Sequence, residues 1–452
     1  MTIIIRLSLL LFIALPSLTG FSQKNNYDPD QRYSIKDLQE DFQFLRTNLE
    51  NTHPNLYLYT SKAEFNLFFD SLYKTIRTPL TQSEFYNLIT LLNSKIKDGH
   101  TMFLPSETAL NYFNENGSFL PFYFFISKGK LYVNMNCSAD TTLKDGAEIQ
   151  SINNISTPNI LNQLLIRQIR DGYNTTYPIW ILANYFKEYF SFLFGHPKTF
   201  AMTYKLRNKE SRAVNINGLS KDSIKFYRQS KYPNNSLPTK DKQGIVLEIN
   251  KQLPFATLSI KSFDNDILHS VYNQDFDSTI EKIFTEIQNA HIHNLVLDVR
   301  NNQGGDFNPS RLLLSYLLQK PIKYLPNGKE YENIIPNENN YKGKLFILIN
   351  GGTFSSTAIL SSYLNFTKRG IFIGEETGGN KIILSGDPID TILPNTKIQF
   401  QFSTVKYFIR EGKNIRHGVV PNYYIIPSID IEIMNKDTIK EFALNLISKN
   451  KQ

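Results

Sequence analysis

Ser355 follows an apolar segment and a glycine pair, an arrangement that can present a serine as a nucleophile. Residues 345–350 (LFILIN) predict a buried strand, and Gly351-Gly352 permits a tight turn before an apolar helix that begins near Ser355. At such a junction, free backbone N–H groups and the helix dipole stabilise a developing oxyanion. The alternative is that Ser355 or Ser356 only caps the helix, and this segment alone does not decide between the two.

A second glycine pair, Gly304-Gly305, follows the strand predicted at 295–299. Glycines at this place let backbone amides approach a bound carbonyl oxygen closely. We therefore expect an oxyanion hole built from the amides of Gly304, Gly305 and Ser356. A lone glycine pair would otherwise be an ordinary tight turn.

These segments belong to an ordered set of motifs. In chain order they are Asp298-x-Arg300-x-Asn302-x-Gly304-Gly305, Thr353-x-Ser355, Gly374-Glu375-x-Thr377-x-Gly379 and Gly418-Val419-x-Pro421. Their order and spacing resemble the C-terminal processing (tail-specific) and tricorn-type serine peptidases over roughly residues 85–430. The resemblance implies a serine-type peptidase that hydrolyses polypeptide substrates through an acyl-enzyme on Ser355. We expect no cofactor.

The general base depends on which branch of the resembled family the chain follows. In the Ser-Lys branch a lysine comes directly after the last glycine of Gly-x-x-Thr-x-Gly, but here that position is Asn380. Lys381 is displaced by one residue, which on a strand would turn its side chain to the other face. The tricorn-like branch uses a histidine before its PDZ-like region, and residues 98–103 (DGHTMF) resemble that motif. His100 is therefore the predicted base, with an ordinary pKa of about 6.5 that suits proton transfer near neutral pH.

The third catalytic member is the weakest part of the resemblance. Tricorn-like enzymes orient the imidazole with an acid just before Gly-Val-x-Pro, but the residues before Gly418 are Ile415, Arg416 and His417. Glu411 is the nearest upstream carboxylate and is our candidate, with Glu375 and Glu376 as alternatives. We predict no metal site, because His291-x-His293 has no third ligand nearby in the sequence.

Two other functions compete with peptide hydrolysis. The fold also resembles that of retinoid-binding repeats related to these peptidases, so a catalytically weak or inactive binding protein is the alternative. Residues 94–97 (SKIK) match the Ser-x-x-Lys pattern of penicillin-recognising enzymes, yet neither Lys-Thr-Gly nor Ser-Asp-Asn occurs in the chain. The penicillin-recognising interpretation is therefore disfavoured.

The elements that must position these residues fall into three stretches. Three capping boxes, followed by apolar residues at helical spacing, predict amphipathic helices before about residue 100, where Gly99 suits a helix end. Aromatic and β-branched runs from 118 to 240 predict a β-rich insert, and residues 143–154 resemble a PDZ domain without its glycine-rich carboxylate-binding loop. The capping boxes are Ser34-x-x-Asp37, Ser61-x-x-Glu64 and Thr81-x-x-Glu84.

The last stretch alternates strands with helices, which predicts a layered α/β sheet with its site at the carboxyl ends of strands. The fold class is thus α/β: a crotonase-like layered β/α peptidase core with an N-terminal helical cap and a PDZ-like β-rich insert. Expected strands are 245–248, 255–260, 295–299, 345–349 and 371–374, and expected helices are 276–289, 311–318 and one after Ser355. The predicted domains are a signal peptide at 1–22, a helical domain at 23–115, the PDZ-like domain at 116–240 and the peptidase core at 241–452. The polar segment 221–244 is the expected boundary before the core.

The N-terminal segment predicts that the chain is exported, and the bulk composition bears on its partners. An early Arg6, the apolar run 7–15 and the small-residue pattern near Ser22 predict a secretory signal cleaved after Ser22, too short to span a bilayer. We expect an exported protein of the periplasm, cell envelope or extracellular space with no integral membrane span after cleavage. The single Cys137 excludes an intramolecular disulfide. The net charge of +8 comes from scattered lysines, so we expect no nucleic-acid partner, and the oligomeric state stays open.

Overall fold

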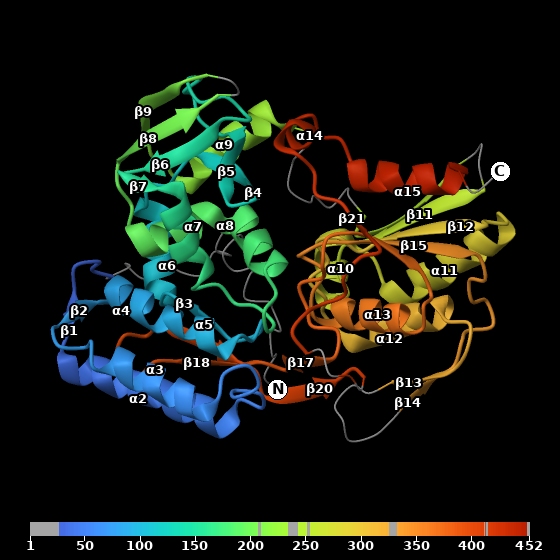
Figure 1. Ribbon diagram of the computed structural model, residues 1–452, viewed down its shortest axis with the longest axis horizontal. Coiled ribbons are helices and arrows are strands. Elements are labelled where there is room, and N and C mark those ends of the chain that lie inside the picture. Colours follow the sequence, from blue (N-terminus) through green and yellow to red (C-terminus); the bar gives the residue numbers. More distant parts are fainter. Residues whose placement is uncertain are drawn as a thin grey trace.

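The computed structural model describes residues 27–206, 209–233, 243–250, 254–324, 332–410, 412 and 415–449. Within them the chain forms a mixed α/β fold with several sheets, in which an N-terminal helical part and a β-rich insert face a layered sheet (Figure 1). The mixed α/β fold expected from the sequence is confirmed. The predicted signal peptide lies outside the described residues.

The N-terminal part is helical, as the capping boxes predict. Ser34, Ser61 and Thr81 each cap a helix, and the acid three residues later returns a hydrogen bond to the cap backbone. The elements are β1 (Arg32–Tyr33), α2 (Ile35–Thr52), α3 (Lys62–Tyr73), β2 (Leu80–Thr81), α4 (Gln82–Ile89), the 3₁₀ helix η1 (Thr90–Leu92), α5 (Asn93–Ile96), β3 (Met102–Leu104) and α6 (Glu107–Asn116). The expected helix end at Gly99 is wrong, because Lys97 takes the left-handed cap conformation with φ of 54°.

The β-rich insert is a sheet in the order β4-β5-β6-β8-β9, with β7 paired to β6. Its elements are β4 (Phe122–Ser127), β5 (Lys130–Asn136), β6 (Glu148–Ile152), β7 (Ile155–Ser156), α7 (Thr157–Leu165), α8 (Thr176–Phe194), β8 (Thr199–Lys205), β9 (Ser211–Asn217) and α9 (Lys221–Lys231). Helix α8 was not predicted, since its aromatic-rich sequence shows little polar periodicity. Helix α9 occupies the segment expected to be a boundary, and its buried Ile224 packs near Phe119 of the insert.

The second large sheet has the order β10-β11-β12-β15-β16-β21, parallel from β11 onward. Its elements are β10 (Ile245–Ile249), β11 (Phe255–Ile260), α10 (Asn265–Tyr272), α11 (Phe276–Asn289), β12 (Asn294–Asp298), α12 (Phe307–Leu317), β13 (Ile322–Tyr324), β14 (Glu332–Ile334), β15 (Lys344–Ile349), α13 (Ser355–Phe366), β16 (Ile371–Gly374) and β21 (Tyr423–Tyr424). Because β12 and β15 are parallel neighbours, their carboxyl ends meet at one edge of the sheet. The loops that follow them carry the two glycine pairs.

The C-terminal segment ties this sheet to the N-terminal part. Its elements are β17 (Ile383–Gly386), β18 (Ile389–Ile392), β19 (Gln399–Phe402), β20 (Val405–Phe408), α14 (Ile429–Ile433) and α15 (Thr438–Lys449). Strand β19 pairs with β3, and its neighbour β18 runs beside the N-terminal helices in Figure 1. The loop containing residues 98–101 directly precedes β3 and is thereby brought to the edge of the large sheet.

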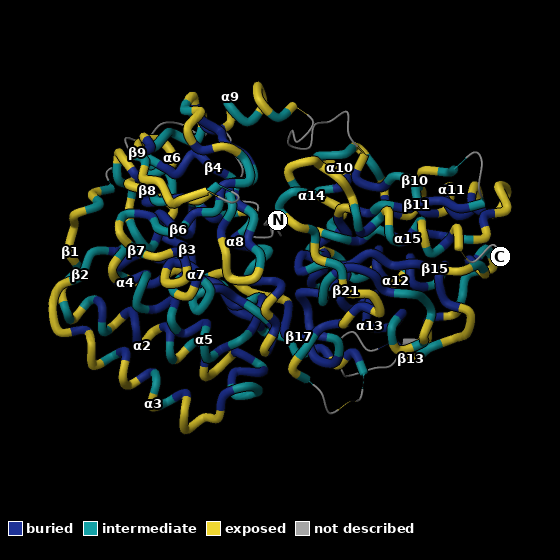
Figure 2. The backbone as a smooth tube through the Cα atoms, turned by 45° about the horizontal axis from the view of Figure 1, so that its top comes forward, coloured by how far each residue is buried: buried dark blue, intermediate teal, exposed yellow. Residues whose placement is uncertain are grey.

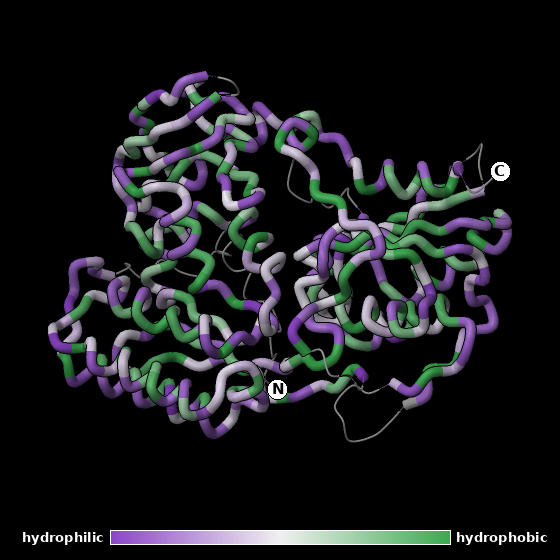
Figure 3. Tube along the Cα trace, viewed as in Figure 1, coloured by the Kyte–Doolittle hydropathy of each residue, from purple (hydrophilic) through white to green (hydrophobic). Residues whose placement is uncertain are grey.

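Burial follows the same division. One cluster of buried apolar side chains joins the N-terminal helices to the insert, and a second lies between the large sheet and helices α11, α12 and α13. Buried and exposed residues alternate along α2 and α3 (Figure 2), while hydrophobic stretches run along the central strands of the large sheet (Figure 3). Among the described residues, no helix has the length and apolar character needed to cross a membrane.

Candidate active site

Ser355 is the first residue of α13, directly after the loop that follows β15. Its φ of 50° lies in the left-handed region, which a residue with a side chain seldom adopts, so the turn is strained. Phe354 is the N-cap residue, and no side chain caps this helix. The interpretation of Ser355 or Ser356 as a helix cap is therefore wrong, and the Ser355 hydroxyl is not used to terminate the helix.

Two side-chain hydrogen bonds and one backbone hydrogen bond hold this strained turn against the end of β12. Thr353 Oγ1 donates to the carbonyl oxygen of Val299 over 3.0 Å. The Phe354 N–H donates to the carbonyl oxygen of Asn302 over 3.1 Å, and Thr357 Oγ1 donates to Asn302 Oδ1 over 2.8 Å. Asn302 is fully buried, so the two motifs at the strand ends form one connected structure.

The glycine pair after β12 lies directly against the serine turn. A Cβ added to Gly304 would lie 2.8 Å from both Ser355 Cβ and the Ser356 nitrogen, and its φ of 92° also requires glycine. The Gly304 N–H already donates to Asn302 Oδ1 over 2.9 Å. Among the described residues, the N–H groups of Gly305 and Ser356 have no hydrogen-bond acceptor, so these two amides are free to bind an oxyanion.

His100 comes from the loop between α5 and β3, far from Ser355 in sequence. Its Nε2 lies 3.2 Å from Ser355 Oγ, across a separation of 255 residues. The imidazole packs against the Phe354 ring, with centroids 4.7 Å apart, and that ring stacks on Tyr177. Gly99 is needed beside it, because a Cβ there would lie 2.5 Å from the Phe354 ring. Burial lowers the pKa of His100 below its ordinary 6.5, so the imidazole is neutral at neutral pH.

Asp98 anchors the His100 loop to two distant segments. Its Oδ2 is bonded to His53 Nε2 at 2.9 Å, Thr101 Oγ1 at 2.7 Å and Ser403 Oγ at 2.6 Å. Its Oδ1 accepts the backbone N–H of His100 over 3.2 Å. Burial alone would raise the pKa of Asp98, but the hydrogen bond and charge of His53 hold it well below its ordinary value. Asp98 is therefore a charged, buried anchor of this loop.

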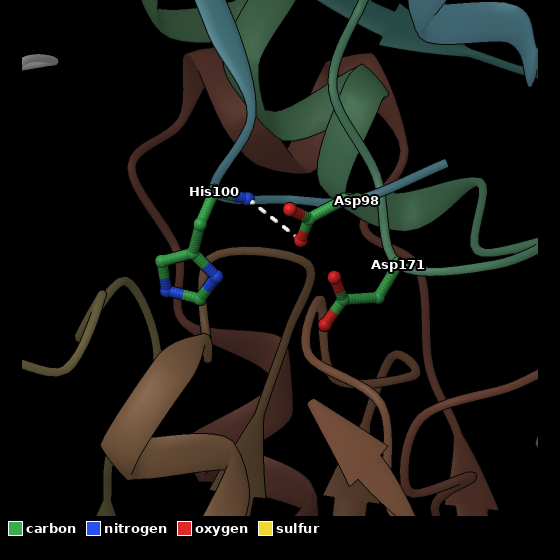
Figure 4. A group of neighbouring side chains, drawn as sticks. All are labelled: Asp98, His100 and Asp171. Atoms are coloured by element: carbon green, nitrogen blue, oxygen red, sulfur yellow. Dashed lines mark hydrogen bonds between the residues drawn. The ribbon is translucent and has the colours of Figure 1, made fainter. Parts of the chain in front are cut away.

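Asp171 is a second buried carboxylate beside the imidazole (Figure 4). Its Oδ1 accepts the Gly99 N–H over 2.9 Å and its Oδ2 accepts the Asn380 N–H over 3.0 Å. Burial and the negative charge of Asp98 raise the pKa of Asp171 to about 7. No local pattern marks Asp171 as a site residue, because the residues DGYN at 171–174 are typical of an ordinary turn.

Of the carboxylates considered for the third member from sequence, neither Glu375 nor Glu376 is hydrogen-bonded to His100 in the described part of the chain. Glu411 lies outside the described residues, so its role stays a prediction. Glu376 Oε1 accepts the Gly418 N–H over 2.8 Å and Asn174 Nδ2 over 3.1 Å, which commits it to the Gly-Val-x-Pro loop. Glu375 is largely buried, and burial raises its pKa.

Asn380 stands at the sequence position where the resembled Ser-Lys branch has its lysine base, and its side chain is bonded to neighbouring loops. Its side chain donates to the carbonyl oxygen of Ile415 and, over 3.3 Å, to Tyr59 Oη. Lys381 lies in the loop before β17, so the alternation of side chains along a strand does not apply to it. Burial and the charge of Arg410 lower the pKa of Lys381.

The carboxylates and the imidazole are also the group within the described chain best placed to hold a cation. One ligand atom each from Asp98, His100 and Asp171 lies within 4.8 Å of the others. Every carboxylate oxygen in the group already accepts a hydrogen bond from the protein. The arrangement is therefore better suited to orienting the imidazole than to coordinating a metal ion.

A cleft of about 1080 Å³ opens between the insert and the large sheet, beside the same strand ends. Its lining includes Trp180 of α8 and Asn301, Asn350 and Glu375 of the strand-end loops. Trp180 Nε1 and Asn350 Nδ2 both donate to Asn301 Oδ1, over 2.7 Å and 2.8 Å. The cleft thus leads to the loops that carry the glycine pairs.

Comparison with known proteins shows which family the second half of the chain resembles. Residues 255–425 match the sequence profile of Peptidase family S41. This chain carries a peptidase family S41 domain. It is 29% identical over 121 residues to the C-terminal processing peptidase, chloroplastic, of Tetradesmus obliquus, a match that covers 25% of each chain. It is 27% identical over 106 residues to the tail-specific protease of Haemophilus influenzae, covering 22% of this chain and 15% of that protein. The matched part thus spans a quarter or less of these curated relatives.

The S41 likeness extends further in three dimensions. The crystal structure of mature CPAF matches with a TM-score of 0.67 and 13% sequence identity, covering 90% of this chain and 96% of that one. The structure of mature CPAF complexed with lactacystin matches with the same TM-score and 12% identity. At these identities the likeness shows a shared fold. It includes the N-terminal part and the insert, which lie outside the S41 match.

Proposed function

We propose that this S41 chain is an exported serine peptidase that hydrolyses peptide bonds in polypeptide substrates. The observation that carries the proposal is the 3.2 Å approach of His100 Nε2 to the hydroxyl of Ser355 on a strained turn at a helix N-terminus. Nucleophile and base within hydrogen-bond reach are what covalent acyl transfer requires. The family match and the tail-specific relative support a polypeptide as the substrate.

The proposed reaction proceeds through an acyl-enzyme. Ser355 Oγ attacks the scissile carbonyl carbon while its proton moves to His100 Nε2, and the resulting oxyanion binds the free amides of Gly305 and Ser356. His100 then gives the proton to the leaving amine as the C–N bond breaks. A water molecule attacks the acyl ester by the same proton path, which releases the acid product and restores Ser355. Gly304 contributes close packing, because its own N–H is bonded to Asn302.

The finer architecture is part of the proposal. Parallel strands whose carboxyl ends carry the site support a crotonase-like core, and the N-terminal helices would act as a cap over it. An edge strand β4 with α8 packed beside it supports a PDZ-like insert, with the cleft as the route of the substrate. The boundaries at about 115 and 240 remain predictions that limited proteolysis would test.

Covalent labelling tests the nucleophile directly. A fluorophosphonate probe should label the folded protein, and Ser355→Ala should abolish that labelling. Ser362→Ala is the matched control, because this serine lies on the same helix and its Oγ only donates to the carbonyl oxygen of Ala358 over 2.7 Å. Persistent labelling of Ser355→Ala would refute the assignment. Absence of both labelling and turnover on unfolded polypeptides in the wild type would favour the binding-protein alternative.

Export has its own test. The N-terminal 22 residues carry the pattern of a cleavable secretory signal. Expression of the full chain in a bacterium that exports it should yield a mature protein beginning at Gln23. An N-terminal sequence that starts at Met1 in the cytoplasmic fraction would contradict this part of the proposal.

A further inference from the structure

Nδ1 of the His100 imidazole, the ring nitrogen that does not face Ser355, has no hydrogen-bond partner among the described residues. Nε2 faces Ser355 Oγ, whereas Nδ1 is buried and has no hydrogen-bond acceptor among the described residues. A neutral imidazole that accepts a proton at Nε2 must carry its own proton on Nδ1. A buried N–H group without an acceptor costs free energy, and the wrong tautomer would place the proton on Nε2 and prevent base catalysis.

Two carboxylates lie on the Nδ1 side of the ring (Figure 4), and they differ in capacity. Asp98 Oδ2 is already bonded to three side chains, and its Oδ1 accepts the backbone N–H of His100 itself. Each oxygen of Asp171 accepts one backbone N–H and retains a free lone pair. Asp171 therefore has the acceptor that His100 Nδ1–H needs.

The position of Asp171 is fixed from both sides of the site. One backbone donor is Gly99, the neighbour of His100, and the other is Asn380, in the loop after the Gly-x-x-Thr-x-Gly motif. The ligand atoms of Asp171 and His100 lie within 4.8 Å of one another, a separation that one bridging water molecule or a small movement of the loop closes.

We propose that Asp171 is the positioning residue of this site, which holds His100 in the tautomer with its proton on Nδ1 and stabilises the imidazolium formed during attack. The proposal rests on the proposed function. The Ser355 proton moves to Nε2, the Nδ1 proton stays on the imidazole, and the carboxylate remains an anion throughout. The loop that supplies a lysine base in the Ser-Lys branch here supplies the Asn380 amide, which binds the acid that serves the histidine.

The charges around the pair determine its dependence on pH. Burial and Asp98 raise the pKa of Asp171 to about 7, while burial lowers the pKa of His100 against the opposing charges of Asp98 and Asp387. The other ionisable groups that interact with these two carboxylates are His53, bonded to Asp98, and the buried Tyr59 and Tyr177, whose pKa values lie above their ordinary range. His100 is thus already neutral where Asp171 ionises. Activity should rise with pH near 7 as Asp171 loses its proton.

The test is Asp171→Asn in the full chain, assayed with an unfolded polypeptide and with the fluorophosphonate probe. We expect kcat to fall by about 10²- to 10⁴-fold with little change in KM, as for an orienting carboxylate in other serine peptidases. The rise of activity near pH 7 should disappear, and Ser355 should still be labelled to completion, only more slowly. A residue that merely supports the fold would lower the labelled fraction and leave the pH profile of the remaining enzyme unchanged.

Asp387→Asn is the matched control. Asp387 is exposed and its φ of 45° suits asparagine. The substitution removes a negative charge that acts on His100 and leaves Asp98 and Asp171 in place. This variant should keep kcat and the rise near pH 7. Retention of kcat within about threefold in Asp171→Asn, with the same pH profile, would overturn the proposal.

The remaining outcomes are also decisive. If Asp171→Asn does not fold, the pH profiles of Asp387→Asn and wild type are compared instead. Removal of the Asp387 charge lowers the pKa of His100, so an activity rise below pH 6.5 that moves to lower pH in this variant belongs to His100 and overturns the proposal. A rise near 7 that does not move supports Asp171. Failure of the wild type to label at Ser355 would instead refute the proposed function and this proposal with it.

Discussion

Replacement of Asp98 by asparagine should destabilise the protein more than any single hydroxyl removal around it. Asp98 joins its own loop, through Thr101, to two segments that are remote in sequence: His53 after α2 and Ser403 after β19. All of these partners are buried. Asparagine keeps the shape of the side chain but replaces one acceptor oxygen with a donor and removes the charge.

The magnitude follows from these contacts. A hydrogen bond to a charged group contributes about 1.5–3 kcal/mol, and the buried Asp98 carboxylate is hydrogen-bonded to four groups. The contacts are not additive, and the remaining oxygen of asparagine still accepts a hydrogen bond. We therefore expect Asp98→Asn to lower the free energy of unfolding by about 3–5 kcal/mol, against about 1–2 kcal/mol for Ser403→Ala.

Equilibrium urea unfolding at pH 7, followed by tryptophan fluorescence and circular dichroism, measures both variants. Asp387→Asn is an exposed control, expected within about 0.5 kcal/mol of wild type.

The stabilisation by Asp98 also depends on pH in a known direction. Because the pKa of Asp98 lies well below its ordinary 3.8, its stabilisation is fully present above 3.8 and is lost as the pH falls below that value. An Asp98→Asn loss no larger than that of Ser403→Ala would refute the view of Asp98 as a charged anchor.

Other substitutions test neighbouring features. Gly304→Ala should slow labelling of Ser355 by at least about 100-fold while the protein stays folded, since the added Cβ would lie 2.8 Å from both Ser355 Cβ and the Ser356 nitrogen and would displace that proposed oxyanion donor. Labelling at the wild-type rate would contradict this packing. Asp437→Asn should increase hydrogen exchange in α15 without slowing labelling, because it removes a carboxylate bonded to Arg300 at 2.6 Å; unchanged exchange would show that the pair does not hold the helix. The free energy of unfolding of Asp171→Asn should increase relative to that of wild type as the pH rises from 3.8 to about 7, because ionisation of a carboxyl with a raised pKa destabilises the folded protein. A difference in unfolding free energy that stays constant with pH would contradict the raised pKa of Asp171.

Local sequence signals predicted much of the fold. The capping boxes at Ser34, Ser61 and Thr81 depend only on residues three apart, and the structure confirms all of them. The strand expected at 255–260 and the helix at 276–289 have the predicted bounds. Helix α8 was missed because it is buried by the tertiary fold on several sides, which leaves no polar face in its sequence. The domain boundaries and the role of Glu411 remain predictions.

Residue types and their spacing predict which side chains have the chemistry of the proposed site. Ordered motifs pointed to Ser355 and its glycine pairs, and the asparagine at 380 pointed to His100 as the base. Their geometry depends on tertiary contacts, because strand β3, which follows the His100 loop, pairs with β19, and His100 meets Ser355 across 255 residues. The tertiary structure also decides which carboxylates face the imidazole. Asp171 has no local signal, since its position depends on backbone donors from two distant loops and its pKa on burial that no short window of sequence records.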